Sequence, residues 1–207
     1  MAQIDDFKAN LIGGGARANQ YRVTITPPSG IAIGLDVRRA SFLVTASQLP
    51  ESTLGEIAVP FRGRTIFVSG DRPAPETWTV TFMNDTDFMI RNAMERWMNG
   101  MNNLQNATGE TTPNDYQTDA YVYQLGRNGI AAANSTQGTA QLDGPKNGDK
   151  VPVLKAYKFH GIFPTNISAI ELSYDQPDTI EEFTVDLQVQ WWDALNPDGN
   201  SMFAETR

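Results

Sequence analysis

Several residue types and sequence patterns are missing from the 207 residues, and each absence excludes a class of structure or site. It has no cysteine, so disulfide bridges and thiolate-bound metals are excluded. It has one histidine, His160, without a second histidine at ligand spacing, which favours a core or surface position over a metal ligand or a base. No apolar run reaches the ~20 residues of a membrane-spanning helix. The first ten residues include Asp5, Asp6 and Lys8, so no secretory signal is expected there.

Catalytic and nucleotide-binding patterns are missing as well. There is no Gly-x-x-x-x-Gly-Lys-Ser/Thr loop for phosphate and no Gly-x-Ser-x-Gly turn for a nucleophile. Acidic residues gather between positions 175 and 182, but their spacing misses that of a calcium loop and favours a solvated turn. A hydrolase that uses Asp175 and Glu181 has no supporting geometry. We therefore expect a protein that is not an enzyme and that holds no cofactor or metal.

The formal net charge is −8, so the surface as a whole repels phosphate groups. Tight binding to nucleic acid is not expected, although a surface that nucleic acid passes without sticking is compatible with this charge. Arg62, Arg64 and Arg72 form the only notable basic group. A nucleic-acid patch needs more positive charge around it, so these arginines favour ion pairs with an acidic neighbour.

The most informative pattern is a two-faced strand predicted at residues 180–192. Side chains in a strand point to opposite faces in turn, so one face here is apolar and the other polar. Such a strand belongs to an antiparallel sheet that covers a core on one side and meets solvent on the other. The apolar face comprises Phe183, Val185, Leu187, Val189 and Trp191, and the polar face comprises Thr184, Asp186, Gln188 and Gln190.

Several other strands and one clear helix are predicted. A helix should follow residue 86, capped by Asp85 or Thr86, because Ile90, Met94 and Trp97 recur at helical spacing. Strands are expected at residues 21–25, 42–45, 54–59, 62–68, 77–83, 119–125, 151–162 and 167–174, with Pro60 marking a bend or an edge. The predicted core comprises Trp78, Val80, Phe82, Ile90, Met94, Trp97, Phe183, Val185, Leu187 and Val189.

This order of elements favours a mainly β (α+β) fold, an antiparallel β-sandwich or split barrel with one packed α-helix, over a doubly wound sheet. We expect a single domain over residues 1–207, with a short helical turn near its start. A partly exposed β-excursion is predicted at residues 47–68 and an insertion loop, rich in small and polar residues, at 126–150. The tail at residues 196–207 is expected to be loose.

Four segments occur in an order that is familiar from a known family. They read PFRGRTIFVSGDR at residues 60–72, WTVTFMND at 78–85, GIFPTN at 161–166 and EFTVDL at 182–187. In these segments the sequence resembles the tail tube proteins of T4-like contractile-tailed phages, whose relatives form the inner tubes of contractile injection systems and type VI secretion. The resemblance runs from about residue 19 to 192 and departs at the insertion and the tail.

The resemblance implies hexameric rings in which the subunits together form a ring-shaped barrel. The rings would stack into a hollow tube inside a contractile sheath, held between baseplate and tail terminator proteins, and phage DNA would pass through without specific binding. It implies a virion tail component, assembled in the host cytoplasm without a membrane anchor. The polar face Thr184, Asp186, Gln188 and Gln190 is then expected to line the channel, and the expected ring-stacking residues are Leu49, Pro50, Leu54, Ile57, Arg62 and Arg64.

Two alternatives stay open at this point. One is a baseplate or tube-initiating protein of the same fold, which would cap a tube and not extend it. The other is a β-sandwich carbohydrate-binding module that uses an exposed tryptophan. Trp191 and Trp192 point to opposite faces of a strand, so at most one of them could serve such a site.

Overall fold

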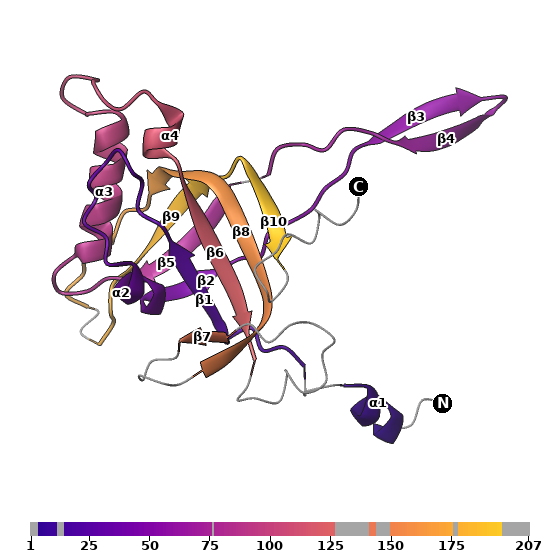
Figure 1. Ribbon diagram of the computed structural model, residues 1–207, viewed down its shortest axis with the longest axis horizontal. Helices are drawn as coiled ribbons and strands as arrows, with labels where there is room; N and C mark the ends of the chain where they lie inside the picture. The colour runs from indigo at the N-terminus through magenta and orange to yellow at the C-terminus, as the bar shows by residue number, and fades with distance from the viewer. Residues whose placement is uncertain are drawn as a thin grey trace.

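The computed structural model describes residues 4–11, 15–75, 77–126, 141–143, 150–175 and 178–195 (Figure 1). The first half of the chain contains α1 Ile4–Asn10, β1 Tyr21–Ile25, α2 Val37–Phe42, β2 Val44–Ser47, β3 Glu56–Phe61, β4 Arg64–Ser69, β5 Trp78–Met83 and α3 Met89–Met101. The second half contains α4 Pro113–Tyr116, β6 Thr118–Leu125, β7 Gln141–Asp143, β8 Lys150–Ile167, β9 Glu182–Gln188 and β10 Trp191–Leu195.

The long strand β8 joins two antiparallel layers. Its first part lies between β6 and β10, and β6 continues to β1. Its last part pairs with β9, which continues through β5 to β2. Gly161 lies between the two parts at φ 62°, a left-handed conformation that glycine adopts without the strain of a side chain. The predicted fold class is therefore confirmed: the chain is mainly β, antiparallel, with one principal helix packed against the sheets (Figure 1).

The core lies between these layers and under α3. The rings of Trp78 on β5 and Phe159 on β8 stack across it, with centroids 4.4 Å apart and planes at 14°. The Trp78 indole N–H also donates to the carbonyl of Gln48 at 3.1 Å, so the buried polar atom is satisfied. All ten residues proposed for the core from the sequence are at most 4% exposed: Trp78, Val80, Phe82, Ile90, Met94, Trp97, Phe183, Val185, Leu187 and Val189.

The helix α3 presents its predicted apolar stripe to the sheets, but it begins later than the capping prediction placed it. It starts at Met89, after Phe88 in the left-handed region at φ 53°. The expected cap Asp85 is engaged elsewhere, since its carboxylate pairs with Arg39 from α2. Asp87 accepts the Met89 N–H at 3.2 Å and so satisfies a donor of the first turn.

Two strand predictions near the carboxyl end are wrong. The strand expected to run to residue 192 stops at Gln188, and β10 restarts at Trp191 after a bend. The bend breaks the alternation, so Trp191 is 50% exposed and not part of the apolar face. The strand expected at residues 167–174 does not form, because β8 itself continues to Ile167 and the chain then leaves the sheet.

The turn of the excursion also differs from the prediction. β3 and β4 form a two-stranded hairpin whose two-residue turn is Arg62–Gly63, at φ 45° and 80°. Of the two roles predicted for Pro60, a bend or an edge, the second holds: Pro60 lies inside β3, opposite Thr65, in a sheet of two strands. Ladder bonds alternate from the pair next to the turn, so position 60 directs its nitrogen away from β4 and a proline costs no ladder bond there.

Two predicted segments fall largely or wholly outside the described residues. Of the predicted insertion at 126–150, only Gly126, β7 and Lys150 are described, and β7 pairs with the start of β8. The predicted loose tail, residues 196–207, lies outside them altogether. Within the described part of the chain, no helix has the length and apolar character needed to cross a membrane.

Candidate assembly interface

The β3–β4 hairpin projects away from the sheets as a separate arm (Figure 1). Every residue of both strands is exposed. The register places Ile57 opposite Val68 and Val59 opposite Ile66, and Phe61 follows on the same side. One side of the hairpin is therefore a continuous apolar surface, which we call the hairpin face and define as Ile57, Val59, Phe61, Ile66 and Val68. The opposite side carries Ala58, Pro60, Thr65 and Phe67.

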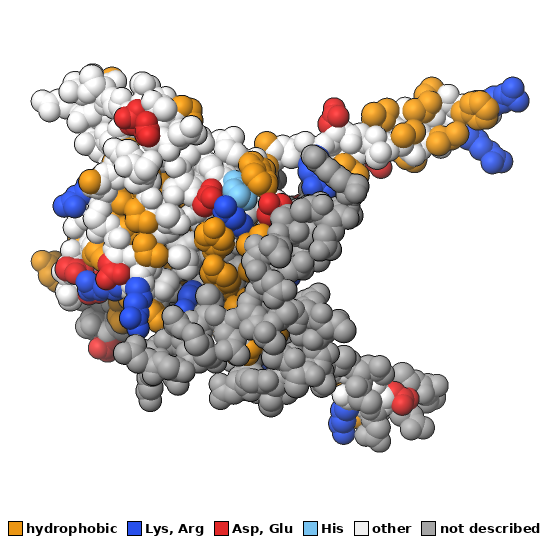
Figure 2. Space-filling view, in the orientation of Figure 1, with side chains coloured by type: hydrophobic (Ala, Val, Ile, Leu, Met, Phe, Trp, Pro, Cys, Tyr) orange, Lys and Arg blue, Asp and Glu red, His pale blue; other side chains and the backbone are white. Residues whose placement is uncertain are grey.

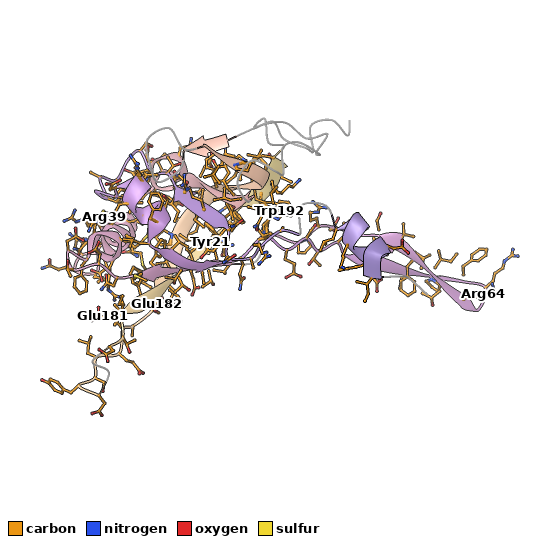
Figure 3. The ribbon with its side chains drawn as sticks, turned by 90° about the horizontal axis from the view of Figure 1, so that it is seen from below. Tyr21, Arg39, Arg64, Glu181, Glu182 and Trp192 are labelled. Carbon is orange, nitrogen blue, oxygen red and sulfur yellow. The ribbon has the colours of Figure 1, made fainter. Side chains whose placement is uncertain are left out.

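Positive charge caps the far end of this arm. Arg62 lies in the turn, with its guanidinium 5.4 Å from the centroid of the Phe61 ring. Arg64 follows at the first position of β4, and Figure 3 shows its side chain at the tip. Figure 2 shows hydrophobic side chains along the arm and blue cationic atoms beyond them. An isolated two-stranded hairpin is marginal in water, and a contiguous exposed apolar surface of this kind marks an interaction site.

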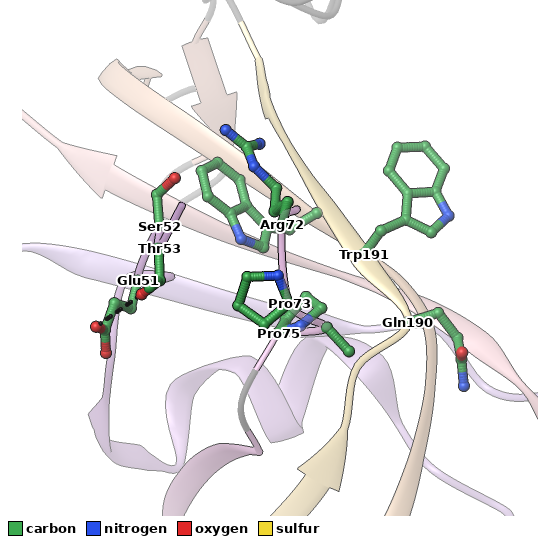
Figure 4. A pocket seen from close by; sticks show the side chains of 10 residues that line it. Glu51, Ser52, Thr53, Arg72, Pro73, Pro75, Gln190 and Trp191 are labelled. Atoms are coloured by element: carbon green, nitrogen blue, oxygen red, sulfur yellow. Dashed lines mark hydrogen bonds between the residues drawn. The ribbon is translucent and has the colours of Figure 1, made fainter. Parts of the chain in front are cut away.

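The base of the hairpin meets β10 around a hollow of ≈ 420 Å³ (Figure 4). Residues before β3, residues after β4 and the start of β10 line it, among them Glu51, Arg72, Pro73 and Trp191. Of the stacking residues proposed from the sequence, Ile57, Arg62 and Arg64 lie on the hairpin itself. The other three precede it: Leu49 and Leu54 are exposed, and Pro50 is partly buried.

The polar face of β9, unlike the apolar hairpin, carries a carboxylate that is held by hydrogen bonds. Asp186 is its only charged residue between Thr184 and Gln188, and its carboxylate is held on both sides. Thr79 donates its hydroxyl to one oxygen at 2.7 Å, and Asn166 donates its amide to the other at 3.0 Å. These two hydrogen bonds, first that of Asn166 and then that of Thr79, lower the pKa of Asp186 below its ordinary value.

The strands beside β9 extend the same polar surface. Thr79 and Thr81 of β5 lie opposite Asp186 and Thr184, and Asn166 of β8 flanks the other side. We call this surface the threonine wall and define it as Thr79, Thr81, Asn166, Thr184, Asp186 and Gln188. All of its residues are polar, and Asp186 is the one among them that carries a charge. Gln190 lies outside it, since it falls in the bend between β9 and β10 and lines the hollow at the hairpin base.

The single histidine lies in a cluster of aromatic and charged side chains. His160 stacks on Trp191 in a cluster with Asp119, Lys158 and Asp193. Burial, and then the neighbouring Lys158, lower the pKa of His160 below 6.5, which outweighs the opposite influence of the two carboxylates. Among the described residues, no group of three or more His, Cys, Asp or Glu side chains is placed to hold a metal ion.

An exposed apolar arm and a polar sheet face suit a protein that assembles with others. A family model described as "Phage tail tube protein" matches residues 16–194. The chain belongs to the phage tail tube protein family. The resemblance inferred from four sequence segments is thereby confirmed, and so is the prediction of a structural tail protein that is not an enzyme.

Individual tail tube proteins support this membership over most of the chain. The chain is 30% identical over 190 residues to the tail tube protein of Serratia phage KSP90, covering 91% of this chain and 94% of that protein. It is 28% identical over 191 residues to tail tube protein gp19 of Enterobacteria phage T4, covering 92% of this chain and 99% of gp19. A phage tail tube protein is a component of the virion tail, as predicted.

The fold is also similar to that of a solved assembly. A chain from the sheath–tube complex of an extracellular contractile injection system, in its extended state, matches with a TM-score of 0.50 at 11% identity. The match covers 95% of this chain and 99% of that one. At this identity the match supports the fold alone. Family membership rests on the sequence comparisons.

Sequence reasoning missed part of the hairpin face. It proposed Ile57 but not Val59, Phe61, Ile66 or Val68, although all four follow the period-2 spacing of a strand. Dividing the segment at Pro60 into two β-rich stretches concealed this pattern, because the turn lies at Arg62–Gly63 and Phe61 belongs to the first strand. Gly63, which lies between two β-rich segments, was the available signal for a tight turn.

Proposed function

We propose that this protein forms hexameric rings that stack into the inner tube of a contractile phage tail and conduct DNA through a polar, negatively charged lumen. The observation that carries the proposal is the exposed β3–β4 hairpin, whose apolar face has no partner within the described chain. In a family of tail tube proteins, another copy of the same chain is the natural partner. Stacking would remove the hairpin face from water, and the hydrophobic effect would drive it.

Joining within a ring is supported by the edges of the sheets. In the described residues, β1, β2 and β10 each pair on one side only. An unpaired edge strand offers ladder hydrogen bonds to a neighbouring chain. Copies placed side by side would complete those ladders and extend each sheet around the ring.

The threonine wall is the proposed lining of the lumen. Its hydroxyl and amide groups carry no charge, and Asp186, held by Thr79 and Asn166, adds one negative charge per subunit. Phosphate groups that pass such a wall meet no cation whose counterion release would hold them. DNA would therefore slide through without binding.

If the chain forms the inner tube, its further partners are the other proteins of a contractile tail. The outside of the tube would contact a contractile sheath, and its two ends would contact baseplate and terminator proteins. Assembly would take place in the host cytoplasm. The single-domain organisation proposed from the sequence fits one such ring subunit.

Electron microscopy of the purified protein tests the proposal directly. We expect rings and tubes from the unmodified chain. A variant with V59S, F61S and I66S should keep its circular dichroism and melting temperature, because these residues are exposed, yet form no long tubes. The variant with A58S and T65S alters the other side of the hairpin and is the matched control. Isolated monomers from the unmodified chain would refute the proposal and favour a binding module.

The lumen assignment has its own test. Replacing Asp186 and Gln188 with lysine in a phage that carries this protein should slow DNA ejection. Two lysines in each of six subunits would add about twelve cations per ring, and these would bind phosphate. The same two substitutions to asparagine and glutamate keep the polar character and serve as control. Unchanged ejection with the lysine variant would place the lumen on another face.

A further inference from the structure

A second projecting segment lies between β8 and β9. We call residues 168–175 and 178–181 the acidic loop. It leaves the sheet after Ile167 and returns at Glu182. Leu172 is 81%, Tyr174 106% and Ile180 61% exposed. Leu172 and Tyr174 therefore make few contacts with the described part of their own chain, and most of Ile180 is exposed as well.

The charge of this loop is entirely negative. Its described residues include Glu171, Asp175, Asp178 and Glu181, and none of them is basic. Glu171, Leu172, Tyr174 and Glu181 also line a hollow of ≈ 400 Å³. The loop thus combines exposed apolar groups, carboxylates and a concave surface of a size that suits a few side chains.

The hairpin and the acidic loop lie at opposite ends of the molecule. Figure 3 places Arg64 at the tip of the long arm and Glu181, with Glu182, at the base of the loop on the other side. Figure 1 agrees, since β3 and β4 project at one end while the segment between β8 and β9 lies at the other, beside α3. The two surfaces cannot meet within one chain, but they can meet between two copies.

Their chemistry is complementary. The hairpin offers Phe61 and its apolar neighbours, followed by Arg62 and Arg64 at the tip. The acidic loop offers exposed leucine, tyrosine and isoleucine with carboxylates around them. A hairpin-to-hairpin contact would oppose arginine to arginine, and a loop-to-loop contact would oppose carboxylate to carboxylate. Only the mixed pairing brings unlike charges together while it buries apolar surface on both sides.

We propose that the acidic loop of one copy is the receiving site for the hairpin of a copy in the next ring. Leu172 and Tyr174 pack on the hairpin face, and Glu171 and Asp175 lie opposite Arg62 and Arg64. The apolar contact supplies most of the affinity, and the charges set which end meets which. This inference deepens the proposed function and rests on it.

The pairing of hairpin and acidic loop would give the tube a direction and would also let it lengthen ring by ring. Each copy carries one hairpin and one acidic loop, so the contact is head to tail and leaves a free hairpin at one end and a free loop at the other. Such a heterologous contact does not close between rings and continues as a filament. Several contacts per ring act together, so weak individual contacts hold a stable stack.

A charge-swap experiment tests the pairing. Variant one carries R62E and R64E, variant two carries E171K and D175K, and variant three carries all four substitutions. We expect variants one and two each to raise the protein concentration needed for tube growth by about tenfold or more, because unlike charges become like. Variant three should return to within about threefold of the unmodified chain, because its charges are complementary again. An equimolar mixture of variants one and two should recover in the same way, as alternating rings.

Controls separate the possible failures. Q105K adds one charge at an exposed position between α3 and α4, outside the hairpin and the acidic loop, and should leave the growth threshold unchanged. L172S with Y174S removes the apolar part of the receiving site and should abolish long tubes, while circular dichroism and melting stay unaltered. The inference is overturned if variant three grows no better than the poorer of the first two, or if both changes to the acidic loop leave growth intact. Tubes from the unmodified chain in that experiment would leave the proposed function standing.

Discussion

The rings of His160 on β8 and Trp191 on β10 stack face to face, with centroids 3.7 Å apart and planes at 9°. The two residues are directly opposite each other in the ladder. His160 Nδ1 lies 3.5 Å from Asp119 and Nε2 lies 3.7 Å from Asp193, the latter beyond hydrogen-bond length. The imidazole is thus partly buried against an indole, and within the described part of the chain its Nε2 has no hydrogen-bond partner.

The first prediction concerns pH. The pKa of His160 is lowered from 6.5 in the folded protein, so between that lowered value and 6.5 the unfolded chain binds more protons than the folded one. The contribution of His160 to the free energy of unfolding should therefore be fully present above pH 6.5 and decrease as the pH falls below 6.5. Urea unfolding from pH 5 to 8, followed by tryptophan fluorescence, measures this. H160Q should make the free energy of unfolding depend less on pH in this range, since the sequence has one histidine. A slope unchanged in H160Q would contradict the assignment.

The second prediction concerns the aromatic stack in the core. Phe159 is 2% exposed and stacks on Trp78, so F159A should lower the free energy of unfolding by about 3–5 kcal/mol through lost burial and the cavity left behind. F67A makes the same chemical change on the exposed hairpin and should alter stability by less than about 0.5 kcal/mol. Guanidinium unfolding of the two variants compares them. Equal losses would mean that the hairpin is part of the cooperative fold.

The third prediction concerns Gly161. It has a φ of 62°, and an added Cβ would lie 2.7 Å from Cγ of Gln190. G161A should therefore destabilise the protein by about 1–3 kcal/mol, from backbone strain and this contact together. Shortening the neighbour with Q190A should recover part of the loss, as a double-mutant cycle would show. G63A has similar backbone strain but open space around the Cβ, in an arm that packs on nothing, so its global unfolding should be unchanged.

The fourth prediction concerns Asp186. Its pKa is lowered by the hydrogen bonds from Asn166 and Thr79, so its contribution to stability is present above the ordinary carboxyl pKa of 3.8 and is lost as the pH falls through the lowered value. The melting temperature of D186N should depend less on pH below that point than that of the unmodified chain. N166A and T79V should each weaken the dependence in part. Identical acid profiles for all four proteins would show that the carboxylate is not held by these groups.

Local sequence patterns predicted a large part of the fold. Residues 182–188 alternate, and those that face the core are buried, because a pleated strand admits only two directions for its side chains. The stripe of Ile90, Met94 and Trp97 is buried for the matching reason in a helix. The same patterns did not locate the helix start, because Asp85 pairs with Arg39, 46 residues away.

The candidate surfaces were predicted less completely. The polar side of β9 could be read from alternation, but its partners Thr79 and Asn166 come from two other strands. The acidic run near residue 175 was read as a solvated turn. Its exposure beside Leu172 and Tyr174 becomes visible only once β8 and β9 are paired.

The order of residues alone settled most of the strands, the helix α3 and which side of each is apolar, because those properties depend on neighbours a few positions apart. It did not predict the helix α2, and it placed a strand at residues 167–174 that does not form. Folding in three dimensions settled where β8 changes layers, why Trp191 meets His160 and not the core, and that the cationic arm and the anionic loop lie at opposite ends. Those relationships join residues far apart along the chain, and they depend on strand register and on close packing around a shared core, which no short window of sequence contains.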